Sequence, residues 1–494
     1  MKKLIKVVVL FFIINIILAC SPYGGGYVGE DYLYGQNGQI VPGDEYKEIV
    51  ENDFIITKEE AISTFRVDSS TAAYPNIRRI INQQADVPKN AVKIEEILNY
   101  FKYDYEAPSS GDSDPIKINL EIGPSPWNEE AKLVSIGLKA KELDLGELPR
   151  SNLVFLLDVS GSMDMPNKIG LMQNAFSLLV ENISDNDIVS IVTYAGSNTV
   201  LLNGESGVNR KRIKNIIEDL QAGGSTAGAK GIETAYEIAK DNYIEGGNNR
   251  VILATDGDFN VGISSVNELK KFIKEKRDEE NIYLSVMGFG YGNYKDNKLE
   301  TLAQNGNGNA YYIDSINEAR KVLVEEIGGT LVTVAKDSKV QVEFNPHFIK
   351  KYRLIGYENK MLKKEDFKDD GVDAGEIGAG HCITAVYEVI FEDEEVESTL
   401  DDNYLKVAFR YKHPDGDESN LIESFVNESH EKETQSIDFI FQTAVLETCL
   451  LLRDSKYKGS SSYQAVITRL NNIEDKLDPY KLEFLELVKK LADY

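Results

Sequence analysis

Histidine, cysteine and tryptophan are scarce in this chain of 494 residues, which contains four, three and one of them. All four histidines lie outside residues 151–330, so the serines of that segment have no imidazole base beside them in the sequence. Among the cysteines, Cys20 ends the amino-terminal apolar run, which leaves Cys382 and Cys449. These two permit one disulfide, and two buried free thiols are an equally good alternative because both lie in apolar stretches.

Basic residues are also in deficit, with 54 Lys and Arg against 81 Asp and Glu, a formal charge of −27. The sequence therefore excludes nucleic acid as a partner, because phosphate binding needs clustered cations. The composition, 42% hydrophobic and 27% charged, is that of a globular protein and argues against a polytopic membrane protein or a disordered chain. The length predicts two to four folded units.

The amino terminus has the form of an export signal. Residues 1–19 carry three lysines ahead of an apolar run that is short for a membrane span. Ile17-Leu18-Ala19-Cys20 resembles the lipobox of bacterial lipoproteins, which implies a lipid anchor on Cys20 and a place in the bacterial cell envelope, at the outer membrane with a periplasmic or surface face. The alternative is a cleaved signal with an incidental cysteine. Residues 20–50, rich in glycine and polar residues, are expected to form a flexible tether.

Residues 151–330 alternate apolar strand-like runs with amphipathic helical patterns. This alternation predicts an α/β fold, a doubly wound, mostly parallel and Rossmann-like sheet with helices on both faces. The predicted strands are 153–157, 187–194, 250–255, 282–288 and 310–313, and the predicted helices are 168–183, 208–221, 228–243, 265–278, 296–304 and 315–330. Ligands of such folds bind beyond the carboxyl ends of the strands.

The segments on either side have a different pattern. Period-two alternation predicts strands near 116–123, 132–143, 340–344 and 404–411, and helical spacing predicts helices at 91–101, along 437–452 and after Asp478-Pro479. We therefore expect β-rich flanking segments and a helical carboxy-terminal part. The predicted organisation is a signal peptide (1–19), a tether (20–50), an amino-terminal flanking domain (51–148), a central domain (149–331) and a carboxy-terminal flanking domain (332–494) that is β-rich to about 425.

Residues whose side-chain oxygens could bind a metal ion follow three of the predicted elements. The first strand ends in the D-x-S-x-S segment of Asp158, Ser160 and Ser162, a glycine-rich loop carries Thr226, and the third strand ends at Asp256. All three segments are expected at one edge of the sheet. A ligand set of hydroxyl oxygens with only two carboxylates suits a hard divalent cation, Mg²⁺ or Mn²⁺. Zinc prefers softer ligands than these.

These motifs resemble those of the von Willebrand factor type A (VWA) family, whose metal-ion-dependent adhesion site (MIDAS) has the pattern D-x-S-x-S, then Thr, then Asp. The resemblance implies that Ser160 and Ser162 coordinate the metal directly and that Thr226 does so directly or through water. Asp158 and Asp256 would hold coordinating waters, and a partner's Asp or Glu carboxylate would complete the coordination. Segments such as 51–54, 94–101, 352–359 and 373–381 further resemble a subgroup of bacterial VWA lipoproteins with flanking domains of unknown function.

Two other readings of the same region fit less well. Asp256-Gly257-Asp258 begins like a calcium-binding loop, but Val261 and Asn267 stand where such a loop needs glycine and glutamate. The glycines at 288, 290 and 292 lack the last glycine of a dinucleotide-binding loop, since Asn293 occupies its place.

The sequence thus predicts a lipid-anchored envelope protein that binds a protein partner through a divalent metal, and no catalytic activity. One alternative is an envelope assembly or chaperone-like factor in which the metal is structural. A hydrolase is the third possibility, and the absence of a nearby base and of a G-x-S-x-G motif argues against it.

Overall fold

The structure, a computed structural model, divides into two units, residues 1–43 and 44–494. It describes residues 33–34, 40–41, 44–67, 69–109, 111–143, 149–224, 231–257, 266–291, 295–372, 374–392, 402–414, 416–432 and 434–493. In the first unit, β1 (Leu33–Tyr34) pairs antiparallel with β2 (Ile40–Val41). The predicted signal and Cys20 lie outside the described residues.

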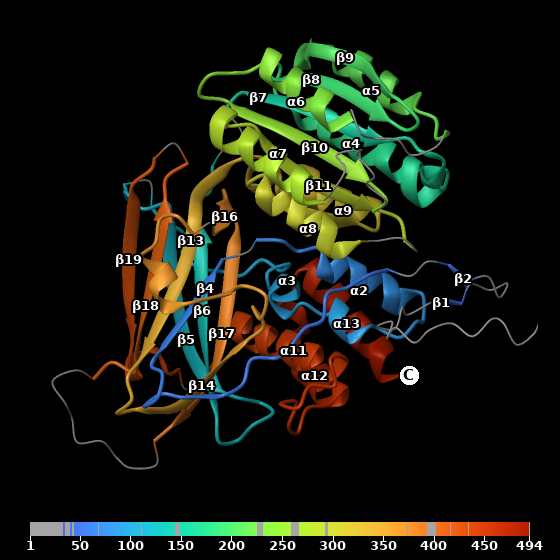
Figure 1. Ribbon diagram of the computed structural model, residues 1–494. Helices are drawn as coiled ribbons and strands as arrows, with labels where there is room; N and C mark the ends of the chain where they lie inside the picture. Colours follow the sequence, from blue (N-terminus) through green and yellow to red (C-terminus); the bar gives the residue numbers. More distant parts are fainter. Residues whose placement is uncertain are drawn as a thin grey trace, which may run out of the picture. The chain divides into compact units, whose positions relative to one another are not determined.

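The second unit contains a six-stranded sheet in the order β12-β11-β10-β7-β8-β9 (Figure 1). All of its strands run parallel except β9, which is antiparallel to β8. The predicted fold class, a mostly parallel α/β sheet, is therefore confirmed. The strands are β7 (Ser151–Asp158), β8 (Ile188–Tyr194), β9 (Asn198–Ser206), β10 (Asn248–Thr255), β11 (Tyr283–Phe289) and β12 (Ala310–Ile313).

Helices cover both faces of this sheet because alternate residues of its buried strands face opposite ways. Phe155 of β7 packs in one apolar cluster and its neighbours Val154 and Leu156 in another. The first cluster lies under α4 (Leu171–Asn182), α5 (Arg210–Glu218), α9 (Ile316–Arg320), the π-helical η7 (Lys321–Glu325) and α10 (Ile327–Leu331). The second lies under α6 (Gly231–Asp241), α7 (Val266–Glu280) and α8 (Asp296–Asn305).

The flanking segments pair with each other in two antiparallel sheets. One has the order β15-β4-β13-β18-β19, with β16 also on β13, and the other the order β3-β14-β17-β6-β5. Phe344 and Tyr352 stack at 3.9 Å between ring centroids, so the two sheets share one core. The strands are β3 (Ile55–Ile56), β4 (Ile62–Arg66), β5 (Ile116–Pro124), β6 (Lys132–Ala140), β13 (Thr333–Phe344), β14 (Ile349–Ile355), β15 (Met361–Leu362), β16 (Gly375–Gly378), β17 (Cys382–Phe391), β18 (Leu405–Lys412) and β19 (Ser419–Val426).

A helical layer combines both ends of the second unit. Its helices are α2 (Ala73–Asn82), α3 (Ile94–Leu98), α11 (Ile437–Leu452), α12 (Tyr463–Asn471) and α13 (Pro479–Ala492), and α2 lies against α13 in Figure 1. Most residues of α11 are buried, as expected for a central helix. Ser436 and Asp478 cap α11 and α13 by accepting hydrogen bonds from backbone N–H groups of the first turn. No helix among the described residues has both the length and the apolar character to cross a bilayer.

The sequence patterns missed one strand and made one helix of the flanking segments too long. The edge strand β9 was not predicted, because it exposes three consecutive residues, 199–201, instead of alternating. The helix expected at 91–101 extends only from Ile94 to Leu98, since Tyr100 and Phe101 leave it to pack in the aromatic core of the helical layer. Of the disulfide alternatives, the structure has Cys382 and Cys449 as free thiols.

Candidate metal-binding site

The candidate site begins where β7 ends. All eight residues of β7 are buried, and its neighbours β8 and β10 run parallel to it. Because parallel strands end at one edge, Asp158 at the end of β7 and Asp256 after β10 lie at the same edge of the sheet; Leu157 pairs with Ala254. The sheet thus brings together two carboxylates that are far apart in the sequence.

The D-x-S-x-S segment forms a compact turn at this edge. The backbone N–H of Ser160 donates to Asp158 Oδ1 at 2.9 Å, and the hydroxyl oxygens of Ser160 and Ser162 are hydrogen-bonded at 3.0 Å. The following residues form a short 3₁₀ turn, Gly161–Met163. Two hydroxyls and a carboxylate are therefore grouped within five residues of chain.

The glycine-rich loop before α6 lies directly against this turn. Gly161 N donates to Gly224 O at 3.1 Å, and Gly223 N donates to Val159 O at 2.8 Å. A side chain on Gly161 would come within 3.3 Å of Gly224 O, so glycine permits the close approach. Thr226, the predicted ligand two residues further on, lies outside the described residues.

Asp158 is fully buried and accepts further hydrogen bonds at Oδ2, from the Tyr194 hydroxyl at 3.0 Å and from Thr255 Oγ1 at 3.3 Å. Burial raises the pKa of Asp158, the hydrogen bonds from Ser160 and Tyr194 oppose that rise, and the charge of Asp256 adds to it. The edge of the sheet therefore concentrates negative charge in a place with little water. A cation would stabilise it.

One such cation comes from the protein itself. Lys168 lies in η4 (Pro166–Gly170), the π-helical turn before α4, and its Nζ is 2.8 Å from Asp256 Oδ2. Both side chains are buried. Lys168 could not be predicted as a site residue, because a lysine near the start of an amphipathic helix is normally solvated and no local pattern marks it as buried.

The site opens to solvent through its second serine. Ser160 is buried and Ser162 is exposed. Met165, three residues further on, is 50% exposed, and so is Tyr291 in the loop after β11. An exposed hydroxyl and half-exposed apolar side chains in neighbouring segments are features expected where another molecule docks.

The donor set fits a hard divalent ion. Four of the five predicted ligands are described, and all offer oxygen: two carboxylates and two hydroxyls. Among the described residues, no group of three or more His, Cys, Asp or Glu side chains is arranged to hold a metal. The hydroxyls of Ser160 and Ser162 are what distinguish this site.

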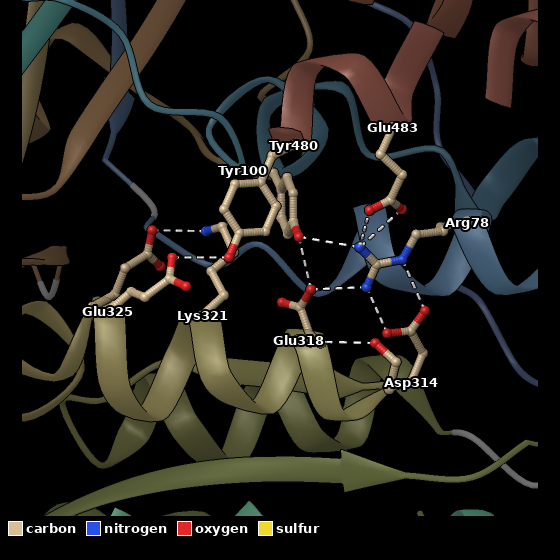
Figure 2. Close-up of polar contacts among 10 residues, drawn as sticks. Arg78, Tyr100, Asp314, Glu318, Lys321, Glu325, Tyr480 and Glu483 are labelled. Carbon is tan, nitrogen blue, oxygen red and sulfur yellow. Dashed lines mark hydrogen bonds and ion pairs between the residues drawn. The ribbon is translucent and has the colours of Figure 1, made fainter. Parts of the chain in front are cut away.

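A second polar cluster, the Arg78 cluster, joins α9, which packs on the parallel sheet, to the helical layer (Figure 2). Arg78 of α2 pairs with Asp314 through two nitrogens, at 2.9 and 2.5 Å, and with Glu318 of α9 at 2.8 Å. The Tyr100 hydroxyl also donates to Glu318, and Glu483 of α13 lies 3.2 Å from the guanidinium. Arg78, Asp314 and Glu318 are buried and pair with one another, whereas Glu483 is 38% exposed. Buried pairing of this kind is typical of a structural contact.

His381, an isolated histidine of the carboxy-terminal segment, lines a cavity of about 410 Å³ with Cys382, Lys139 and Glu326. Its Nδ1 is enclosed and finds no hydrogen-bond partner among the described residues. Burial lowers the pKa of His381 to about 4, and Glu326 only partly opposes this. The histidine is thus a neutral packing residue at physiological pH.

The parallel sheet and the oxygen groups at its carboxyl edge define a VWA-domain protein. The sequence matches the family described as "von Willebrand factor type A domain" over residues 152–325, one described as "von Willebrand factor" over 41–135, and one described as "Uncharacterized protein YfbK, C-terminal" over 329–493. It is 37% identical over 471 residues to the "Uncharacterized protein YfbK" of Escherichia coli strain K12, covering 91% of this chain and 81% of that protein. The chain belongs to the YfbK family.

Two solved structures are more distant. A von Willebrand factor type A protein from Catenulispora acidiphila is 16% identical, with a TM-score of 0.41, and the match covers 74% of this chain and 89% of that one. Proximal thread matrix protein 1 from the mussel byssus, solved with a zinc-occupied MIDAS motif, is 22% identical, with a TM-score of 0.30 over 39% of this chain and 46% of that one.

Proposed function

We propose that this protein binds a protein partner through a divalent cation, Mg²⁺ or Mn²⁺, held at the carboxyl edge of the parallel sheet. Ser160 and Ser162 would coordinate the ion directly, and Thr226 directly or through water. Asp158 and Asp256 would hold coordinating waters. An Asp or Glu carboxylate of the partner would complete the coordination, because so few anionic ligands leave the ion electrophilic.

The observation that carries this proposal is the pairing of the Ser160 and Ser162 hydroxyls, 3.0 Å apart, beside the buried carboxylate of Asp158. Asp158 orients the turn by accepting the Ser160 N–H, and Tyr194 and Thr255 fix the other oxygen of the carboxylate. This network would preorganise the two serine hydroxyls, of which that of Ser162 lies at an exposed position. Half-exposed Met165 and Tyr291 would supply apolar contact area to the partner.

We also propose that Cys20 is lipidated and that residues 20–50 tether the folded part to a membrane of the bacterial envelope. Residues 149–331 would then act as the binding domain, with 51–148 and 332–494 as its support. The pairing of β4 with β13 and of β6 with β17 is consistent with one joint support built from both flanking segments. The lipid anchor is tested by metabolic labelling with a fatty acid, which Cys20→Ala should abolish.

The binding proposal is tested by cross-linking and pull-down from envelope fractions, with MgCl₂ or with EDTA. Ser162→Ala removes a hydroxyl from an exposed position, so the fold should be unchanged while partner recovery is lost to the same extent as in EDTA. Ser113→Ala, at an exposed position in the flanking segment, is the matched control and should recover the partner normally. Equal recovery by the wild type in MgCl₂ and EDTA would refute the proposal.

A further inference from the structure

The lysine beside the candidate metal site is held in an unusually well-defined place. The Lys168 side chain is only 6% exposed, and its Nζ donates to Asp256 Oδ2, whose side chain is 0% exposed. Buried lysines are rare, and they persist when an opposite charge compensates them. The pair therefore places one positive charge of the protein on a carboxylate that is proposed to serve a metal ion.

The loop after β11 is shaped to let this side chain reach Asp256. Gly290 has φ +76°, and a Cβ built on it would lie 2.5 Å from Cγ and 2.6 Å from Cε of Lys168. Any other residue would collide with the lysine stem as well as strain the backbone. The Tyr312 hydroxyl donates to the Gly290 carbonyl at 2.5 Å and fixes the loop. This contact explains the glycine at position 290, which resembled part of a nucleotide-binding loop in the sequence.

The charges at this edge have a consequence for metal binding. Asp158 and Asp256 lie buried at the same edge of the sheet, where a nearby cation stabilises their negative charges. Lys168 supplies one positive charge. A divalent ion near the same carboxylates would be repelled by the ammonium, since two cations in a poorly solvated place interact strongly.

We infer that Lys168 is an internal counter-cation that competes with the divalent ion for Asp256. It stabilises the metal-free protein and raises the metal concentration needed to fill the site. This inference rests on the proposed function, because it assumes that the site takes a metal. It adds a regulatory property: partner binding would respond to the concentration of divalent cation around the protein.

Lys168→Met tests the inference, because methionine retains an apolar unbranched stem and lacks the charge. The full chain without the signal peptide is titrated with MgCl₂ and MnCl₂ by calorimetry at constant pH. We expect the variant to bind the ion at least about tenfold more tightly than the wild type, since one repelling charge is gone. Lys271→Met, which removes a lysine that is 79% exposed on α7, is the matched control and should bind as the wild type does.

A second readout separates competition from a merely structural role. In EDTA, Lys168→Met should unfold at a lower urea concentration than the wild type, because Asp256 loses its counter-charge, and millimolar MgCl₂ should restore most of the difference. A loss of stability that magnesium does not restore would overturn the inference.

The two proposals fail in different ways. If wild type and Lys168→Met bind metal with equal affinity, or the variant binds more weakly, Lys168 is no competitor and the inference is wrong while the proposed metal site stands. If neither protein takes up magnesium or manganese, the proposed function fails and the inference fails with it.

Discussion

The Arg78 cluster gives the sharpest prediction about stability. Arg78→Met keeps a long apolar stem but removes the cation that pairs with both Asp314 and Glu318. Both carboxylates are buried, so the substitution leaves two buried charges without their partner. Breaking a buried ion pair in this way costs about 3–5 kcal/mol of unfolding free energy. We expect a loss of that size at pH 7.

The same variant has a pH signature. Burial already raises the pKa of Glu318, and the positive charge of Arg78 holds it down in part. Without Arg78 that folded-state pKa rises further, and a group whose pKa is raised on folding contributes stability at low pH that is lost as the pH increases. The loss caused by Arg78→Met should therefore be smaller at pH 5 than at pH 7.

The assay is urea unfolding followed by the fluorescence of Trp127, the single tryptophan of the chain, which is buried in the helical layer. Arg212→Met is the control, because Arg212 is 67% exposed in its pair with Glu205 and should contribute less than about 1 kcal/mol. A loss for Arg78→Met no larger than that of Arg212→Met, or one that grows toward pH 5, would show that the cluster does not hold the structure together as described.

Two further predictions concern single residues. Asp478→Ala removes the helix cap that accepts hydrogen bonds from Tyr480 N and Lys481 N, and should lower the unfolding free energy by about 1 kcal/mol. Asp478→Asn keeps a side-chain acceptor and should retain most of that free energy. An equal loss in both variants would contradict the capping role. His381, whose pKa is lowered to about 4, stays neutral in the folded protein while the unfolded chain protonates it below about pH 6.5, so it destabilises the fold as the pH falls from 6.5 to 4. His381→Gln should therefore reduce the drop in unfolding free energy between pH 6.5 and pH 4 by up to about 3 kcal/mol, as measured by urea unfolding at the two pH values. If the variant and the wild type show the same pH dependence, the lowered pKa of His381 is refuted.

The pattern of apolar residues in the sequence correctly predicted the strands that are buried along their whole length. β7 and β10 are buried along their whole length, so they appear in the sequence as continuous apolar runs, and their ends located Asp158 and Asp256. The edge strand β9 could not be predicted, because Leu202 is its one buried residue and a single buried position gives no alternating pattern. The helix predicted at 315–330, the last one within residues 151–330, is divided into α9, η7 and α10. The spacing of its apolar residues gave no sign of this change from α-helix to π-helix and back.

Contacts between distant segments were beyond sequence reasoning for a different reason. Phe65 of β4 pairs with Val340 of β13, although the whole parallel-sheet domain lies between them in the sequence. Nothing in either segment indicates that it pairs with the other. The Lys168 contact with Asp256 belongs to the same class, since it depends on where η4 places a flexible side chain and on the room that Gly290 leaves. Motif spacing could locate the oxygen groups of the candidate site, but it could not show which charge already lies beside them.

Metal titration of the purified chain tests the central claim most directly. Manganese binding measured by electron paramagnetic resonance should show a single saturable site in the wild type that magnesium displaces. The Ser160→Ala and Ser162→Ala double variant, folded by circular dichroism, should lose that site. Saturable binding that persists in the double variant, or its absence from the wild type, would contradict the account.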